Sequence, residues 1–432
     1  MFIDNNFNIN SKGHLTIGGV DTIKIVEKFG TPLYVIDENY FRNQCQKMKA
    51  TMQKFYGNNS LICFASKAFC CKEIFRVIQS ENLGIDVVSL GEMFTAVETG
   101  FNVDKIYLHG NNKSIEELTY AIKNKISRIV VDNFSELELL NELAGKFNTK
   151  VKILIRVKPG IDAHVHEFVK TGQIGSKFGF AISTGEALFA VKQALKLKNV
   201  ELIGAHCHIG SQILEIAPFV LAAKIMIEFF NLIKQQTNKV LSELNLGGGF
   251  GINYLPEEES LNVDKCFELV FNEIKNKCDK FNLKIPFLVI EPGRFLIAKA
   301  GITLYKIGCV KKIPDVKTFV FVNGGMTDNP RYALYRSAYD FCIANKASIK
   351  KTEIVSIAGK CCESGDLLGE KIMLQHAEKN DILAVFATGA YNYSMASNYN
   401  RNLRPAVVFI KNGQVRLTVK RETLQYLIEN DL

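Results

Sequence analysis

The sequence predicts an α/β protein with a (β/α)8 TIM barrel followed by an antiparallel β domain, and three observations predict it. Eight short apolar runs rich in β-branched residues recur between Leu61 and Glu291. Stretches with helical periodicity separate these runs, and this alternation is what a parallel barrel needs. After about Ala300 the pattern changes to short alternating segments divided by turn residues, which is typical of antiparallel β structure.

The eight runs are the expected barrel strands, and the first five begin about every 23 residues. They are Leu61–Ser66, Gly84–Ser89, Lys105–His109, Arg128–Asp132, Val151–Val157, Glu201–His208, Val240–Leu246 and Pro286–Glu291. Helices are expected between them, for example from Ser114 (SIEELTYAIKN) and from Ser135 (SELELLNELAGKF), where a serine with an acid in the first turn predicts the helix start. A doubly wound open sheet is the alternative, because a strand pattern does not show whether the sheet closes.

The C-terminal part supplies the β domain, through segments such as ITLYKIGCVKKI, TFVFVNGG, DILAVFAT and AVVFIKNGQVRLTVKRE. The first 32 residues look similar, with LTIGGV flanked by polar turns. We therefore expect the barrel over residues 33–300, and a β domain built from both chain ends, residues 1–32 and 301–432.

Composition narrows the class of protein. With 432 residues, 47% hydrophobic and 22% charged, the chain exceeds a single small fold and can bury a large core. The net charge of +9 comes from scattered lysines, which argues against a nucleic-acid surface. The 11 cysteines include no C-x-x-C pair, so neither a zinc ribbon nor a disulfide framework is indicated. Without a signal-like leader or a long apolar run, we expect a cytoplasmic protein with no membrane partner.

Polar residues close each expected strand at its carboxyl end, and in a barrel these ends converge on one mouth. Lys67 follows the first strand and His208 ends the sixth. The last two strands lead into GGGFG (residues 247–251) and EPGR (residues 291–294). Loops in these two places commonly hold phosphate, through close backbone N–H groups and here an arginine.

Lys67 and Glu291 together point to pyridoxal phosphate. A lysine at the inner end of a barrel strand loses hydration and can form an imine with an aldehyde. A carboxylate beside a pyridine nitrogen keeps that nitrogen protonated, so that the ring accepts electrons, which gives Glu291 a use. His208 could stack on the face of the ring.

A family resemblance follows from motifs that occur in order along residues 30 to 410. The chain resembles the diaminopimelate decarboxylase family, which belongs to the alanine-racemase-like, fold-type III pyridoxal phosphate enzymes. This resemblance implies a barrel followed by a β domain, homodimers with shared active sites, pyridoxal 5'-phosphate as the cofactor, and no metal. The motifs are FASKAF, GIDVVSLGE, HGNNKS, HEFVKTGQIGSKFGF, HCHIGSQ, LGGGFG, EPGR, GGMTDNPRYALY, CCESGD and TGAYNYSMASNYN.

The resemblance also implies residue roles. Lys67 matches the Schiff-base lysine, His208 the ring-stacking histidine, Glu291 the partner of the pyridinium, and Cys362 the proton donor contributed across the dimer. Matches around the cofactor are Asp86, Ser211, Gly247, Gly248, Gly249, Pro292, Gly293, Arg294 and Tyr391. Matches to substrate contacts are Arg294, Arg331, Tyr335, Glu363 and Tyr391.

The sequence departs from the family pattern at a few positions. Cys361 adds a second thiol beside Cys362, and Lys360 and Tyr332 stand where proline is frequent in the family. We do not expect these changes to abolish activity.

The reaction implied is decarboxylation of meso-2,6-diaminopimelate to L-lysine and CO2, the last step of lysine biosynthesis by the diaminopimelate pathway. A distal amino group and a distal carboxylate on the substrate call for an acid and an arginine together, and Glu363 with Arg331 and Arg294 offers both. An ornithine or lysine decarboxylase has no distal carboxylate to bind, and a buried unpaired arginine would be costly there.

Three alternatives remain at this stage. A racemase of the same superfamily would need two bases across the ring, and CESGD is not its signature. A metal-dependent barrel hydrolase could use the H-x-H pairs His164/His166 and His206/His208, but such enzymes place H-x-H at the first strand and Asp at the last. An inactive homologue is the third, and the presence of Lys67, Glu291 and Cys362 argues against it.

Overall fold

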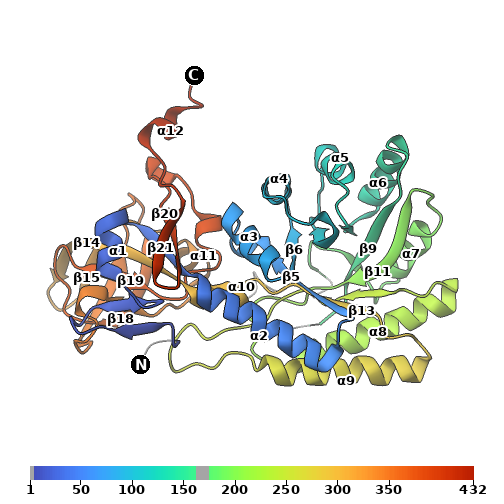
Figure 1. The fold of residues 1–432 in the computed structure, drawn as a ribbon, viewed down its shortest axis with the longest axis horizontal. Coiled ribbons are helices and arrows are strands. Elements are labelled where there is room, and N and C mark those ends of the chain that lie inside the picture. Colours follow the sequence, from blue (N-terminus) through green and yellow to red (C-terminus); the bar gives the residue numbers. More distant parts are fainter. Residues whose placement is uncertain (1–3, 162–174) are drawn as a thin grey trace. The chain divides into compact units, whose positions relative to one another are not determined.

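A computed structural model describes residues 4–161 and 175–432 of the chain. These residues divide into two compact units that differ in architecture (Figure 1). The barrel unit comprises Cys45–Ile252 and Ser260–Gly293, and the β unit comprises Met1–Gln44, Asn253–Glu259 and Arg294–Leu432. Both chain ends therefore contribute to the β unit.

Eight parallel strands of the described chain form a closed barrel. Neighbours pair in chain order, and the last strand pairs with the first through Leu288–Ser60, Val289–Leu61 and Ile290–Ile62. This last pairing closes the ring, so the predicted barrel is confirmed and the open doubly wound sheet is excluded. The strands are β5 (Ser60–Ala65), β6 (Gly84–Val87), β7 (Ile106–Leu108), β8 (Arg128–Val131), β9 (Val151–Lys158), β11 (Val200–His206), β12 (Glu243–Asn245) and β13 (Phe287–Ile290), with β10 (Phe180–Ala181) added beside β9.

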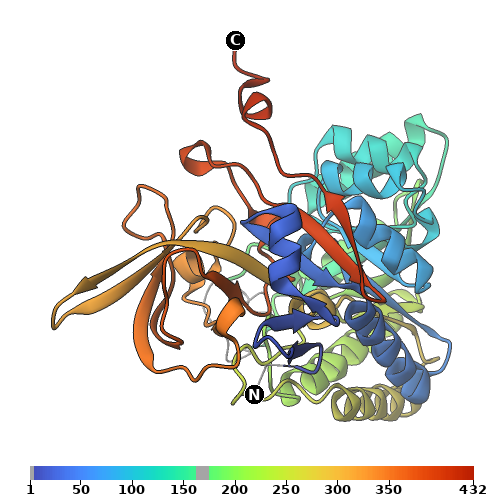
Figure 2. The same ribbon diagram turned by 60° about the vertical axis from the view of Figure 1, so that its left-hand side comes forward.

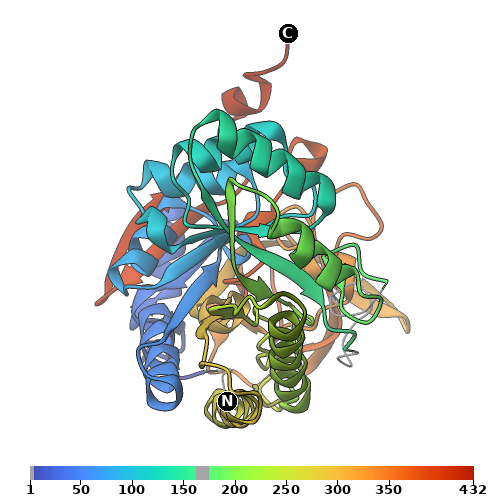
Figure 3. The ribbon, with the colours of Figure 1, turned by 90° about the vertical axis from the view of Figure 1, so that its right-hand side faces the viewer.

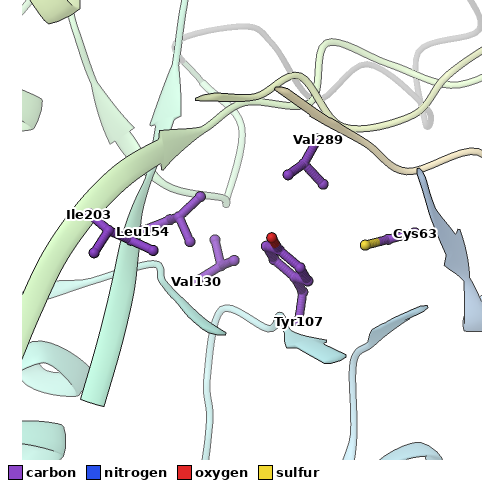
Figure 4. Packing of buried hydrophobic residues seen from close by; sticks show 6 residues of the cluster. All are labelled: Cys63, Tyr107, Val130, Leu154, Ile203 and Val289. Carbon is purple, nitrogen blue, oxygen red and sulfur yellow. The ribbon is translucent and has the colours of Figure 1, made fainter. Parts of the chain in front are cut away.

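Side chains fill the interior of the barrel. One buried cluster takes one residue from each of six strands, and its members point toward a common centre in Figure 4. Such a packed interior leaves the strand ends as the place for chemistry. The cluster consists of Cys63, Tyr107, Val130, Leu154, Ile203 and Val289.

Helices surround these strands, as the nearly end-on view in Figure 3 shows. Each buries an apolar stripe, for example Ile74, Phe75, Val77 and Ile78 in α3. The helices are α2 (Glu38–Tyr56), α3 (Lys72–Ser80), α4 (Leu90–Glu98), α5 (Ile115–Lys123), α6 (Phe134–Lys146), α7 (Glu186–Ala194), α8 (Ala217–Thr237) and α9 (Val263–Phe281).

The observed start of α5 agrees with the start predicted from the sequence, and the observed start of α6 does not. Ser114 and Glu117 form the capping box expected before α5. The predicted start at Ser135 is wrong, because α6 begins at Phe134 with Asn133 as its N-cap. The Asn133 side chain accepts the backbone N–H of Glu136, and asparagine is as good an N-cap as serine.

The β unit contains two sheets. A small sheet joins β1 (Phe7–Ile9), β2 (Leu15–Ile17) and β3 (Val20–Asp21), followed by α1 (Thr22–Phe29). In the large sheet the order is β18-β17-β15-β14-β4-β20-β21, with β19 also paired to β14 and β16 paired to β19. Its strands are β4 (Leu33–Asp37), β14 (Gly301–Ile313), β15 (Lys317–Val322), β16 (Phe341–Ile343), β17 (Glu353–Ala358), β18 (Leu367–Leu374), β19 (Ile382–Val385), β20 (Ala406–Lys411) and β21 (Gln414–Val419).

Most strand pairs of the large sheet are antiparallel, as expected, and Figure 2 shows the long β14 and the β20–β21 hairpin in gold and red. Two pairs, β15–β17 and β4–β20, are parallel. The strand β4 begins at Leu33, the first residue of the predicted barrel, and pairs with β14 and β20 of this sheet. Short helices complete the unit: α10 (Arg294–Ile297), α11 (Arg331–Tyr335) and α12 (Leu424–Ile428). Within the described ranges, no helix has both the length and the apolar character needed to cross a membrane.

Candidate active site

The carboxyl ends of the barrel strands bring the predicted barrel residues to one mouth. Lys67 lies in a single 3-10 turn (Ser66–Ala68) directly after β5, and its side chain is exposed. Asp86 is buried within β6. His208 comes two residues after β11, and Glu291 comes one residue after β13.

Glu291 is buried at this mouth and accepts hydrogen bonds from three side chains. Its Oε1 lies 2.8 Å from Nε2 of His109 and 2.7 Å from Nδ2 of Asn245. Its Oε2 lies 3.1 Å from Nε2 of His206. Burial by itself would raise the pKa of Glu291, but the interactions with His109 and His206 outweigh it and hold the pKa well below the usual range. Glu291 is therefore an ionised carboxylate.

The predicted glycine turn packs tightly against the same strand end. Gly247 and Gly249 have φ of +67° and +109°, which glycine adopts without strain. A Cβ on Gly248 would lie 2.1 Å from the carbonyl oxygen of Glu291, so no larger residue fits there. The backbone N–H of Gly248 donates to Nδ1 of His208 at 3.2 Å, which places the predicted stacking histidine beside the turn.

The loop that carries Ser211 packs against the other side of the turn. The Ile213 N–H donates to the carbonyl of Gly249 at 2.9 Å, and a Cβ on Gly249 would lie 2.4 Å from the carbonyl oxygen of Gly210. Ser211 lies in the segment between Gly210 and Ile213, close to the glycine turn in the fold.

Asp86 and Lys67 interact electrostatically across the mouth. Burial raises the pKa of Asp86 well above its usual range, the Glu291 carboxylate adds to this, and the Lys67 ammonium partly opposes it. Burial lowers the pKa of His208, and the Lys67 ammonium lowers it further. At neutral pH His208 is therefore an uncharged imidazole near a cation.

The predicted substrate residues of the β unit form a cluster of arginines and tyrosines. The Tyr391 ring receives two guanidinium groups, with Cζ of Arg294 at 4.8 Å and Cζ of Arg331 at 5.3 Å from its centre. Arg331 also lies 5.0 Å from the centre of the Tyr335 ring. Arg294 donates from Nη1 to the hydroxyl of Tyr254. Both arginines are buried, so the cluster is a concentrated positive charge suited to a carboxylate or phosphate group.

Cys362 and Glu363 also belong to the β unit and have hydrogen-bond partners outside that cluster. Both are exposed; the Cys362 N–H donates to Oδ1 of Asn400, and the Glu363 side chain accepts the N–H of Gly365. Within the described part of one chain, no hydrogen bond or ion pair joins Cys362 or Glu363 to Arg294, Arg331 or Tyr391. A single β unit therefore leaves the predicted thiol and acid without a predicted partner.

Three residues surround Glu291, and their contact with it was not predicted from the sequence: His109, His206 and Asn245. Each lies at or directly after the carboxyl end of a barrel strand, and this position indicates that it lies at the barrel mouth. The sequence does not indicate that its partner is Glu291. The same two histidines and Glu291 offer ligand atoms within 4.8 Å of one another. Of the two H-x-H pairs, His164/His166 lies outside the described residues, and in the other pair His206 contacts Glu291 while His208 contacts Gly248.

The donor set at the barrel mouth fits pyridoxal phosphate. The exposed amine of Lys67 suits the aldehyde, and the ionised carboxylate of Glu291 suits the pyridine nitrogen. The uncharged imidazole of His208 suits the ring face, and the turn of three glycines suits the phosphate. Buried Oδ1 of Asp86 also has no hydrogen-bond partner among the described residues, as expected where a ligand is to bind.

Comparisons with known proteins agree with this geometry. Residues 39–298 match the sequence model of the family described as pyridoxal-dependent decarboxylase, pyridoxal binding domain. The diaminopimelate decarboxylases of Bacillus methanolicus and Bacillus subtilis are 47% and 44% identical, covering 98% and 100% of this chain and 98% of each relative. A solved structure of diaminopimelate decarboxylase from M. jannaschii in complex with L-lysine is similar at a TM-score of 0.93 with 34% identity, covering 100% of this chain and 99% of that one.

Proposed function

The chain belongs to the diaminopimelate decarboxylase family of pyridoxal-dependent decarboxylases, and we propose roles for its residues on that basis. The enzyme is a lyase that decarboxylates meso-2,6-diaminopimelate to L-lysine and CO2, the last step of lysine biosynthesis by the diaminopimelate pathway. The observation that carries the proposal is the barrel mouth, where Lys67, His208, Glu291 and the glycine turn lie together.

The barrel unit would hold the cofactor. Lys67 Nζ would bind its aldehyde carbon, Gly247–Gly249 and Ser211 would receive its phosphate, and His208 would cover one ring face. Pro292 and Gly293 shape the adjoining loop, and Asp86 would lie near the ring. When bound, pyridoxal phosphate supplies the electron sink that accepts the electron pair left by the departing CO2.

Glu291 would act on the pyridine nitrogen. As an ionised carboxylate it is a hydrogen-bond acceptor only, so it would stabilise a proton on that nitrogen. That proton would make the ring a better acceptor of electrons, and Glu291 would thereby lower the barrier to decarboxylation.

The β unit would bind the substrate. Arg331 and Arg294, with Tyr335 and Tyr391, would bind carboxylate groups, and Glu363 would bind the distal ammonium group. The Cys362 thiol would donate its proton to the carbon that has lost CO2. The resulting thiolate would regain a proton from solvent.

The assembly we propose is a homodimer with shared active sites, located in the cytoplasm. The support is that Cys362 and Glu363 are exposed and that, among the described residues of one chain, neither forms a hydrogen bond or an ion pair with Arg331 or Tyr391. A partner subunit that supplies these two side chains would complete the site.

The proposal is tested by incubating the purified protein with pyridoxal phosphate and meso-diaminopimelate and measuring lysine and CO2. Borohydride reduction followed by peptide mapping should place the cofactor on Lys67. Lys67→Ala should lose both the label and the activity, because no imine forms without the amine. Lys196→Ala, at an exposed lysine, is the matched control. A label on another lysine, or full activity of Lys67→Ala, would overturn the assignment.

A further inference from the structure

Glu291 has one acceptor position left for a ligand. A carboxylate offers about four lone-pair sites, two on each oxygen. Among the described residues, His109 and Asn245 donate hydrogen bonds to Oε1, whereas Oε2 accepts a single hydrogen bond, from His206. The surrounding residues therefore keep this carboxylate ionised and leave one lone-pair site, on Oε2, that can accept a further hydrogen bond.

Asn245 has a fixed orientation in this arrangement. It is fully buried, and its Oδ1 accepts the backbone N–H of Gly247 at 2.8 Å. The amide nitrogen must then face Glu291, where Nδ2 lies 2.7 Å from Oε1. The Glu291 N–H also donates to the Gly247 carbonyl at 2.7 Å. Asn245 thus joins the glycine turn to the carboxylate.

The two histidines are donors in their uncharged forms. Burial lowers the pKa of His206 to about 3 and also lowers the pKa of His109, in both cases against the opposing effect of Glu291. An uncharged imidazole carries one N–H, and here it lies on Nε2, the atom that faces Glu291. Nδ1 of His206 is buried and has no partner among the described atoms, which agrees with an unprotonated nitrogen.

We propose that His109, His206 and Asn245 are positioning residues that hold Glu291 as a carboxylate aimed at the pyridine nitrogen, and that Asn245 also couples this aim to the glycine turn. The inference deepens the proposed function, because it rests on the role of Glu291 given above. It adds that one buried side-chain amide, that of Asn245, hydrogen-bonds both to the glycine turn proposed for the phosphate and to Glu291, proposed for the ring nitrogen.

Asn245→Asp is the sharpest variant, because it is nearly isosteric. It retains an oxygen for the Gly247 N–H but replaces the donor to Glu291 by an oxygen, which disturbs the carboxylate while the turn keeps its partner. His109→Phe and His206→Phe remove the other two donors. His109→Gln restores an amide donor and is the rescue variant, and His376→Gln, at an exposed histidine paired with Glu353, is the control.

The readout is the 15N chemical shift of the pyridine nitrogen in holoenzyme reconstituted with 15N-labelled pyridoxal phosphate. We expect a protonated nitrogen in the wild type and in His376→Gln, and a shift toward the unprotonated form in Asn245→Asp, His109→Phe and His206→Phe. The turnover number should fall about tenfold to a hundredfold in each, the loss of one hydrogen bond to a charged group, with KM changed less than about threefold. His109→Gln should recover most of the wild-type 15N chemical shift and most of the wild-type turnover number.

Glu291→Gln separates the inference from the function on which it rests. If Glu291→Gln moves the nitrogen signal while the three donor variants leave it unchanged, the positioning inference is wrong and the role of Glu291 stands. If Glu291→Gln itself leaves the signal unchanged, the proposed role of Glu291 fails. One equivalent of a transition metal in the purified wild type, lost in His109→Phe and His206→Phe, would show that these groups ligate a metal and would overturn the inference.

Discussion

The ammonium group of Lys113 lies 2.7 Å from Oε1 of Glu136, and both side chains are only 2% exposed. Lys113 Nζ also donates to the carbonyl groups of Gly110 and Val130, at 2.8 and 2.7 Å. Glu136 Oε2 accepts the backbone N–H of Asp132 at 3.1 Å. The pair therefore ties the loop after β7, which begins with His109, to the end of β8.

Breaking this pair should destabilise the protein. In Lys113→Met the Glu136 charge stays buried without its partner, and we expect a loss of about 3–5 kcal/mol in the free energy of unfolding. Urea denaturation followed by circular dichroism measures it. The double variant Lys113→Met/Glu136→Leu should recover part of the loss, because no isolated charge remains.

The matched control is Lys146→Met, which removes one partner of an exposed pair with Glu142 and should cost less than about 1 kcal/mol. A double variant as unstable as Lys113→Met would show that the lost backbone contacts matter more than the buried charge.

His206 makes folding pH-dependent with a definite sign. Its folded-state pKa of about 3 lies below the ordinary value near 6.5, so the unfolded chain binds more protons between these values. The contribution of uncharged His206 to the free energy of unfolding is therefore fully present above about pH 6.5 and is lost as the pH falls toward 3. At pH 5 the loss should be about 2 kcal/mol relative to pH 8.

The measurement compares the free energy of unfolding of wild-type and His206→Gln apoprotein at pH 8 and pH 5. The variant cannot take up this proton, so its pH dependence should be smaller by about the same 2 kcal/mol. Equal pH dependence in the two proteins would contradict an uncharged, buried His206.

The barrel was largely predictable from the sequence because each of its strands is buried on both faces and appears as a short continuous apolar run. All eight expected runs contain the observed strands or most of their residues. Helix starts were less predictable: Asn133 and Ser135 are both good caps, and only packing decides between them. The parallel pair β4–β20 joins segments from opposite ends of the chain, and no local pattern shows such a partner.

The candidate site was predictable to the extent that chemistry follows strand ends. Lys67, His208 and the glycine turn lie at the mouth because parallel strands all end there. The environment of Glu291 was not predictable, because His109 lies 182 residues from it in the chain and His206 lies 85. Their contacts depend on how the barrel strands are aligned and on which side chains point into the barrel. Neither can be predicted from a single sequence.

A shared active site can be tested by mixing inactive variants. Lys67 belongs to the barrel unit and Cys362 to the β unit. If a site takes one residue from each subunit, homodimers of Lys67→Ala and of Cys362→Ala are both impaired, while a mixed dimer contains one intact site. In an equal mixture half of the dimers are mixed, so up to about a quarter of wild-type activity should return.

The control for this mixture is Lys67→Ala exchanged with a tagged copy of itself, which should stay inactive. Mass spectrometry of the tagged and untagged subunits confirms exchange. No recovery after confirmed exchange would mean that each chain builds its own site.

Arg331 is expected to determine the preference for a substrate with a distal carboxylate. It is buried, and its Nε has no hydrogen-bond partner among the described residues, so a bound anion would satisfy it. Arg331→Ala should raise KM and lower turnover for diaminopimelate, because a charge-assisted bond of about 1.5–3 kcal/mol is lost. Lysine has no distal carboxylate to use that contact and should be a poor substrate for the wild type, so the ratio of the two kcat/KM values should narrow by about tenfold or more. Arg336→Ala, on an exposed arginine in the same segment, should leave the ratio unchanged. If Arg331→Ala lowers kcat/KM for both compounds by the same factor, Arg331 supports the fold or the cofactor and does not read the distal carboxylate.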